Sequence, residues 1–209
     1  MIFLKLRWFL AGALALSGCG NTANDELIKG LWQRFTSPDK TTATADIDAL
    51  RAAVTPQALA QIDGPVLLAQ VPALQGAAIL VLGGRNAGVE TFLTPDGVSI
   101  STENGMLVAT RGFGYDLMTA DVAEPLSAIT DARPRAVRIH RYLNGENQLV
   151  PQSFVCRYVA LTPTQINESC QSSSDSFENS YTTNSKGQIV MSRQWISPQL
   201  GYITTERLK

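Results

Sequence analysis

The sequence of 209 residues is poor in the residue types that build most catalytic and metal centres. His140 is its only histidine, and its three cysteines form no CxxC pair. Because zinc usually takes four nitrogen or sulfur ligands, we predict neither a metal site nor a cofactor. A GxSxG nucleophile motif is also absent, so His140 has no recognisable triad around it and we assign no catalytic residue.

The chain also lacks a charge excess of either sign. Its 17 lysines and arginines stand against 18 acidic residues, and this balance argues against nucleic acid as a partner. The apolar run from Trp8 to Leu16 is too short to cross a bilayer as a mature helix. Internal repeats and long linkers are missing as well, so a single folded domain is the simplest prediction.

What the sequence does contain is an N-terminal export signal. Lys5 and Arg7 precede the apolar run, which ends in Leu-Ser-Gly-Cys over Leu16 to Cys19. This order is typical of a bacterial lipoprotein, in which Cys19 carries a diacylglycerol and an amine-linked acyl chain such as palmitate. Two or more acyl chains hold a protein stably on a membrane. The alternative is an ordinary signal peptide with an unrelated cysteine.

Cleavage before that cysteine predicts three parts. Residues 1–18 are a removed signal peptide, residues 19–23 are a lipidated tether, and residues 24–209 are one β-rich periplasmic domain. The mature chain has 191 residues, enough for a sizeable core, with 15 cations against 18 acids. Gly20 is not the aspartate that commonly retains lipoproteins at the inner membrane of enteric-type bacteria. We therefore expect an outer-membrane, lipid-anchored protein that faces the periplasm.

Once Cys19 carries lipid, Cys156 and Cys170 remain as one pair in an oxidising compartment. We predict a disulfide between them. In the chain-entropy model, closing a loop of about 15 residues contributes about 3 kcal/mol. The alternative, a metal or redox site, lacks a CxxC motif and a second histidine.

Hydrophobic periodicity predicts helices in the first part of the mature chain. An apolar stripe marks a helix from Asn24 to about Thr36, which either docks on the domain or lies on the membrane surface. Two short helices follow, Ala45 to Val54 and Thr55 to Ile62, the second with Thr55 as its cap and Pro56 at its first position.

From Val66 onward, β-type runs alternate with turn residues and predict consecutive antiparallel hairpins, interrupted by one helix over Asp121 to Ile129. Asn144-Gly145 is the strongest hairpin signal. The fold class is therefore mainly β, a large curved antiparallel sheet or partly open β-barrel with a few short, mostly N-terminal helices. The predicted strands are Val66 to Val71, Ala77 to Leu82, Val89 to Leu93, Val98 to Ser101, Met106 to Thr110, Ala136 to Leu143, Gln148 to Leu161, Phe177 to Thr183, Gln188 to Ile196 and Tyr202 to Leu208.

The segment Arg111 to Asp116 is the most suggestive polar cluster, since it combines two glycines with a cation, two aromatics and an acid. Its glycines either allow close approach of a ligand or mark a bulge at a sheet edge. Asp116 with Asp121 or Glu124 would supply the carboxylate pair of a glycosidase. The plainer interpretation, which we favour, is a set of solvated acids at a strand end and a helix start.

Near the C-terminus, Arg193, Trp195 and Tyr202 place aromatic rings beside polar groups. Such side chains stack on sugar rings in many glycan sites, although a half-buried strand and turn have the same composition. Arg111, Asp116, Arg193, Trp195 and Tyr202 are therefore the candidate contacts for a glycan or a partner protein.

His140 lies on a predicted strand, where alternation places it on one face with Arg138 and Tyr142. Val137 and Ile139 lie on the opposite face. We expect the face that carries His140 to be polar or solvated, and we assign His140 no catalytic role.

The order of motifs along the whole mature chain resembles the YjbF/GfcB family of bacterial lipoproteins. The resemblance rests on the lipobox and on Asp63-Gly64-Pro65-Val66-Leu67, Gly84-Arg85-Asn86, Val108-Ala109-Thr110-Arg111-Gly112-Phe113-Gly114, Asp116-Leu117-Met118, His140-Arg141-Tyr142-Leu143-Asn144-Gly145 and the ending from Arg193-Gln194-Trp195 to Gly201-Tyr202. It implies a periplasm-facing outer-membrane lipoprotein from exopolysaccharide or group 4 capsule clusters, with a mostly antiparallel, barrel-like fold. Such clusters also encode an outer-membrane export channel. The resemblance supplies no catalytic residues.

The leading hypothesis is a non-enzymatic accessory lipoprotein that binds polysaccharide export proteins or the polysaccharide itself. A second hypothesis is a glycan-modifying enzyme that uses Asp116 and another carboxylate. A third is a carrier that holds an acyl chain inside the curved sheet, although an anchor at Cys19 would hamper a carrier.

Overall fold

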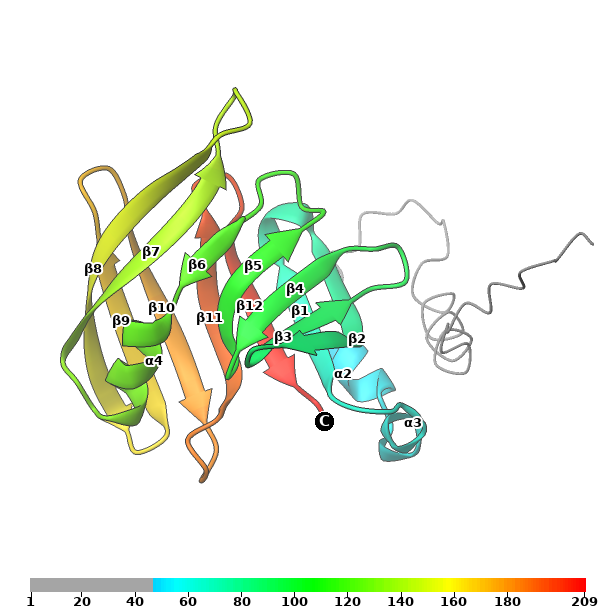
Figure 1. Ribbon diagram of the computed structural model, residues 1–209. Coiled ribbons are helices and arrows are strands. Elements are labelled where there is room, and N and C mark those ends of the chain that lie inside the picture. Colours follow the sequence, from blue (N-terminus) through cyan, green and yellow to red (C-terminus); the bar gives the residue numbers. More distant parts are fainter. Residues whose placement is uncertain (1–46) are drawn as a thin grey trace, which may run out of the picture.

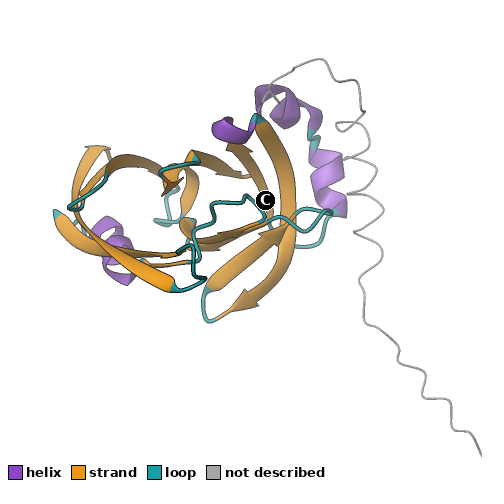
Figure 2. Ribbon diagram, turned by 90° about the horizontal axis from the view of Figure 1, so that it is seen from above, coloured by secondary structure: helices purple, strands orange, loops and turns teal. Residues whose placement is uncertain are grey.

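The computed structural model describes residues 47–209, which form one antiparallel sheet of 12 strands. The sheet curls until its two ends nearly meet (Figure 1 and Figure 2). This confirms the predicted fold class. In chain order the strands are β1 (Val66–Val71), β2 (Gly76–Asn86), β3 (Val89–Leu93), β4 (Ser99–Glu103), β5 (Met106–Arg111), β6 (Thr119–Asp121), β7 (Arg135–Leu143), β8 (Leu149–Thr162), β9 (Gln165–Gln171), β10 (Ser176–Thr183), β11 (Ile189–Ser197) and β12 (Gly201–Arg207).

Across the sheet the order is β5-β4-β3-β2-β1-β12-β11-β10-β9-β8-β7-β6. Strands adjacent in sequence are therefore paired in the sheet, except β5 and β6, which form its two edges. One further pair, β1 with β12, joins strands far apart in sequence. Hairpins between neighbouring segments account for most of the sheet, which is why turn signals in the sequence predicted it well. Only the joining of the first and last strands and the curling are long-range events.

The described helices are short. The helices α2 (Ile47–Ala53) and α3 (Pro56–Gln61) match the predicted pair, and Thr55 caps α3 by accepting a hydrogen bond from the Ala58 amide at 3.2 Å. The helix α4 (Ala123–Thr130) packs on β7 and β8, and a single 3-10 turn, η1 (Pro72–Leu74), follows β1. The helix predicted from Asn24 to Thr36 lies outside the described residues.

The strand β1 is buried on both faces, because helices cover one face and the barrel core covers the other. Val66 and Leu68 pack with Leu50 of α2 and Ile62, which follows α3. Leu67 points the other way into the largest core cluster. A strand covered on both sides reads as a continuous apolar run, as Val-Leu-Leu-Ala does here.

Backbone groups at the start of β5, which is an edge strand, form hydrogen bonds with a side chain from across the barrel. Gln194 of β11 is fully buried, and its Nε2 donates to the Gly105 carbonyl at 3.0 Å. Its Oε1 accepts from the Leu107 amide at 2.8 Å. Edge strands otherwise leave such groups unpaired. Gln194 therefore ties the start of β5 to β11.

Two strands were not predicted, β6 and β9. The sequence of β9 is Gln-Ile-Asn-Glu-Ser-Cys-Gln, and its buried positions are Glu168 and Cys170. A strand whose inward residues include a carboxylate carries no apolar alternation to recognise. The strand β6 has only three residues, too few to show a period.

The predicted hairpin at Asn144-Gly145 is present between β7 and β8, but its turn is longer than two residues. The Asn144 Oδ1 accepts from the amides of Glu146 at 3.0 Å and Gln148 at 2.9 Å, and Asn147 takes a positive φ of 58°. The asparagine side chain, rather than an Asn-Gly type I′ turn, closes this loop.

Candidate functional site

The loop after β5 is held together by its own polar side chains. Asp116 accepts hydrogen bonds from the Thr110 hydroxyl at 2.8 Å and from two backbone amides of the loop at 3.0 and 3.3 Å. Arg111 donates to three backbone carbonyls, that of Thr110 in β5 and those of Leu117 and Met118 in the loop, at 2.6 to 3.2 Å. Both groups thus shape the connection from β5 to β6.

The other two carboxylates considered for a glycosidase also bind backbone amides. Asp121 accepts from the Ala123 amide at 3.3 Å, where α4 begins. Glu124 accepts from the Val137 amide of β7 at 2.8 Å. Asp116 and Asp121 therefore stabilise the segments in which they lie, and Glu124 holds α4 to β7.

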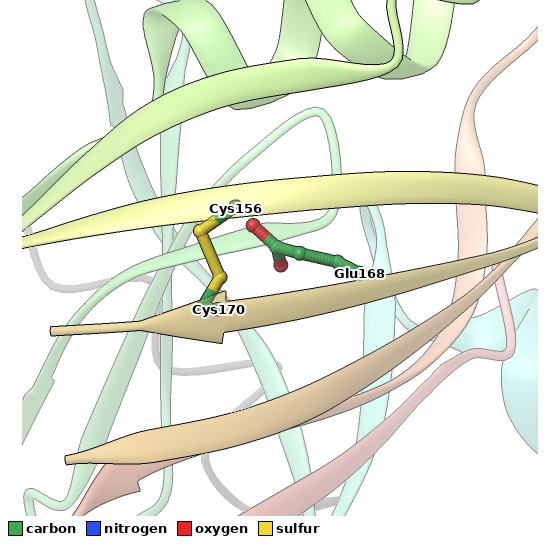
Figure 3. Close-up of side chains that lie close together, drawn as sticks. All are labelled: Cys156, Glu168 and Cys170. Atoms are coloured by element: carbon green, nitrogen blue, oxygen red, sulfur yellow. A yellow bond between two sulfur atoms is a disulfide. The ribbon is translucent and has the colours of Figure 1, made fainter.

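Cys156 of β8 lies directly opposite Cys170 of β9, and their sulfur atoms form a disulfide with an S–S distance of 2.01 Å (Figure 3). The carboxylate of Glu168 lies beside it, with the candidate ligand atoms within 4.8 Å of one another. Sulfur atoms bonded to each other offer no thiolate to a metal ion. Among residues 47–209 this is the only such group, and it is a cross-link between strands.

Glu168 is the centre of what we call the buried cluster, namely Arg138, Tyr158, Glu168, Asn179 and Tyr181. Arg138 Nε lies 3.3 Å from Glu168 Oε1, and both side chains have no exposed surface. The Tyr181 hydroxyl and the Asn179 amide each donate to Glu168 Oε2 at 2.6 Å, and the Tyr158 hydroxyl donates to Oε1. A buried carboxylate with one cation and three further donors is stable only as a complete set.

The environment of the buried cluster favours the protonated forms of its two tyrosines and of Arg138. Burial, followed by the nearby Glu168 carboxylate, raises the pKa of Tyr158. Burial also raises the pKa of Tyr181 well above its ordinary value, with Arg138 acting against it and Glu168 with it. Burial alone would lower the pKa of Arg138, but Glu168 and the tyrosines raise it overall. Neither the two tyrosines nor Arg138 is thereby prepared to exchange a proton near neutral pH.

The prediction that the His140 face is solvated was wrong. Alternation along β7 is as expected, but Arg138 and His140 have no exposed surface, whereas Val137 is 41% exposed. The sheet curls toward the polar face because Glu168 neutralises Arg138 and aromatic rings surround His140. Apolar Val137 is left outside.

His140 lies within an aromatic core formed by Phe154, Phe177 and Trp195. Its ring stacks near Phe177 and Trp195, with centroid distances of 5.7 and 5.9 Å, and Phe177 stacks on Trp195 at 4.7 Å. Trp195 is only 6% exposed. The structure therefore places this candidate glycan contact in the core, where it is the cross-strand partner of Tyr202 but does not line the groove described below.

The hydrogen bonds of His140 identify its tautomer. The Tyr142 hydroxyl donates to the Ile196 carbonyl at 2.7 Å, so it accepts from His140 Nδ1 at 2.9 Å. His140 Nε2 is then a buried lone pair without a partner among the described residues. Burial, and then the charge of Arg138, lowers the pKa of His140 well below its ordinary value of 6.5. His140 is therefore a neutral member of the core.

The outer face of the same strands forms a groove of about 950 Å³, and this groove brings together two of the predicted contacts. The guanidinium carbon of Arg193 lies 3.3 Å from the centroid of the Tyr202 ring, which is close cation–π stacking. Arg135 and Arg157 line the same groove, and sequence reasoning missed both. The sequence could have indicated this pair, because the hairpin between β7 and β8 places Arg135 directly opposite Arg157.

The predicted lipidation site, Cys19, lies outside the described residues. Within residues 47–209, no helix has both the length and the apolar character needed to cross a membrane.

Comparisons with known proteins agree with this architecture. The chain is similar to a crystal structure of the hypothetical lipoprotein YmcC from Escherichia coli K12, with a TM-score of 0.62 and 16% identity over 81% of this chain and 98% of that chain. At that identity the likeness shows a shared fold. No curated protein matches the chain. The family model described as group 4 capsule polysaccharide lipoprotein GfcB, YjbF matches residues 24–208, which include every described strand. The chain therefore belongs to this family of group 4 capsule polysaccharide lipoproteins.

Proposed function

We propose that this protein is an outer-membrane lipoprotein that assists the secretion or assembly of an exopolysaccharide or capsule without catalysing a reaction. It acts by binding the export machinery or the polymer at the periplasmic side of the membrane. The lipid on Cys19 and the four-residue tether that follows it would keep the domain within reach of other outer-membrane components.

The observation that carries the proposal is the groove on the outer face of β7–β12. It offers exposed arginines on a sheet whose strands are hydrogen-bonded on both sides and cross-linked by a disulfide. A rigid surface with unused donors is suited to binding, because little ordering is required when a partner arrives. Together with the family of the chain, this surface supports a binding role in polysaccharide export.

Deletion of the gene in its native host tests the proposal. We expect less secreted polysaccharide or an altered chain length, restored by the intact gene and not by a Cys19→Ala variant that cannot be lipidated. Immunoblots that show equal amounts of both complementing proteins provide the control. Polysaccharide unchanged in amount and length after deletion would contradict the proposal.

The enzyme alternative has less support. Asp116, Asp121 and Glu124 each accept hydrogen bonds from backbone amides, which gives each a structural role. The test is to incubate the purified mature protein with its cognate polymer and measure polymer size and linkage. We expect both to be unchanged.

The acyl-carrier alternative is weakened by the size of the available apolar pocket. The pocket at the mouth of the core beneath β1–β5, lined in part by Val71, Leu74 and Phe113, has a volume of about 140 Å³. Pockets for small ligands usually have volumes of about 300–1,000 Å³. Lipid extracted from the purified domain and analysed by mass spectrometry would support a carrier, and we expect none.

A further inference from the structure

The arginines of the groove have no acidic partner. Among the described residues, Arg135, Arg157 and Arg193 form no ion pair and no side-chain hydrogen bond, although all three are exposed. In contrast, Arg51, Arg85, Arg133, Arg138 and Arg207 each pair with a carboxylate. The single acid that lines the groove, Glu178, lies farther than ion-pair distance from all three arginines. The groove therefore carries a net positive charge on a mature chain that is acidic.

Two of these arginines repel each other by their position in the sheet. Arg135 of β7 and Arg157 of β8 are direct cross-strand partners. Side chains at such positions lie about 5 Å apart at Cβ, and like charges there destabilise the sheet. An anion bound between the two guanidinium groups would remove this repulsion and would receive donors from both.

The third arginine is held in a fixed orientation. The guanidinium carbon of Arg193 lies over the ring of Tyr202 at 3.3 Å from its centroid, and the Tyr202 hydroxyl accepts a hydrogen bond from the Glu178 amide at 3.2 Å. Stacking uses the face of the guanidinium and leaves its N–H edge free to donate. A second acidic group would therefore meet a preorganised donor on the opposite side of the groove.

The disulfide lies directly beneath these groups. Cys156 sits between Val155 and Arg157 on β8, and it is joined through the inner face to Cys170 of β9. The cross-link holds the spacing of the two strands that form the floor of the groove. Val155, which is 62% exposed there, offers an apolar surface between the charged groups.

We propose that this groove binds a segment of acidic polysaccharide, with Arg135 and Arg157 holding one carboxylated sugar and Arg193 holding another. Sugars combine apolar C–H faces with hydroxyls, which suits Val155 and the serines that also line the groove. A groove of about 950 Å³ with cations at separate positions suits an extended chain of spaced charges better than a single small anion. This inference rests on the proposed function, of which it specifies the ligand and the site.

Binding of oligogalacturonate, a chain of carboxylated sugars, to the lipidated full-length protein in non-ionic detergent tests the inference. We expect Arg157→Gln and Arg193→Gln each to weaken binding by about tenfold or more, as loss of a charge-assisted bidentate contact does. Arg157→Lys should weaken binding by an intermediate amount, because lysine keeps the positive charge but cannot donate two parallel hydrogen bonds to a carboxylate. Unchanged denaturant midpoints establish that the variants are folded.

The matched control is Arg85→Gln, which changes net charge equally but lies on β2, where Arg85 pairs with Glu90 at 2.8 Å. Its binding should change less than twofold. A loss equal to that of Arg157→Gln would overturn the inference, since binding would then reflect overall charge. Equal binding of a carboxyl-reduced oligomer would also overturn it, as would preferential binding of phosphatidylglycerol vesicles or polyglutamate.

A chromosomal Arg157→Gln allele separates this inference from the function on which it rests. If deletion of the gene impairs polysaccharide secretion but Arg157→Gln does not, the groove inference fails and the accessory function stands. If deletion has no effect, the accessory function fails, and the binding measurements decide the groove alone.

Discussion

The inner and outer faces of β7–β11 carry the same kinds of charged residue in opposite situations. Inside, Arg138 is paired with Glu168 and donates a hydrogen bond to the Tyr181 hydroxyl. Outside, Arg135 and Arg157 face each other across two strands without an acidic partner. Arg138 is thus needed for stability, whereas Arg135 and Arg157 on the outer face remain available to bind a ligand.

This difference shows how function and stability are separated in a thin sheet. A buried charge must be fully compensated, because the desolvation of an unpaired ion costs several kcal/mol. An exposed charge is solvated by water and can remain unpaired at little cost. The inner face can therefore change little without unfolding, while the outer face can be arranged for a ligand.

The largest expected effect comes from breaking the inner pair. Glu168→Gln should lower the free energy of unfolding by about 3–5 kcal/mol, because Arg138 would remain charged and buried without its partner. Urea unfolding monitored by tryptophan fluorescence measures the change. As a control, Glu206→Gln removes a partly exposed partner of Arg51, 2.5 Å away, and should cost at most about 1 kcal/mol. Equal costs for the two variants would contradict the distinction.

The disulfide between β8 and β9 should contribute the next largest amount. Cys156→Ala with Cys170→Ala should lower the free energy of unfolding by about 3 kcal/mol, chiefly because the unfolded chain gains freedom. Reducing agent should destabilise the wild-type protein by a similar amount and leave the double variant unaffected. A wild-type denaturant midpoint that does not respond to reduction would show that the cross-link does not contribute to stability.

The neutral His140 makes the inner face sensitive to acid. Since burial holds the folded pKa well below 6.5, the unfolded chain binds a proton that the folded chain does not, so stability falls as the pH drops below about 6.5. The contribution is at most about 1.4 kcal/mol per pH unit. His140→Phe keeps a stacked ring and should remove this part of the slope. If the free energy of unfolding of the wild type and of His140→Phe fell equally as the pH was lowered from 7, the assignment of this slope to His140 would be contradicted.

The smallest effect should have the opposite sign. Arg157→Gln removes the repulsion from Arg135 and should leave the free energy of unfolding unchanged or raise it by up to about 0.5 kcal/mol. Arg133→Gln, which removes an exposed ion pair with Asp131, should leave it unchanged or lower it. A clear loss of stability in Arg157→Gln would show that Arg157 supports the fold.

Local features of the sequence predicted most of the fold correctly. The turn Asn104-Gly105 has positive φ values of 46° and 82°, as a two-residue hairpin requires, and it joins β4 to β5 where expected. The cap at Thr55 is equally local. These elements were predictable because each depends on only a few neighbouring residues.

The candidate site was less predictable from the same information. Arg193 and Tyr202 were selected together and do stack on each other, whereas Trp195, selected with them, is in the core. The ladder between β10 and β11 ends at the pair of Ser180 and Arg193, and the Trp195 amide donates instead to Asn179 Oδ1 at 2.8 Å, so the surroundings of Trp195 were not readable from spacing. Arg135 and Arg157 were missed because charge on a strand alone does not distinguish a solvated face from a binding groove.

By itself the sequence predicts the lipoprotein signal and the pairing of the two remaining cysteines, and it determined the succession of hairpins, because these depend on short motifs and local turns. Tertiary structure alone decided which face of β7 is buried. Alternation shows that two faces differ, but the polar one can turn inward only if a compensating group such as Glu168 arrives from another strand. The same folding leaves Arg135, Arg157 and Arg193 together on the outside, where the groove forms.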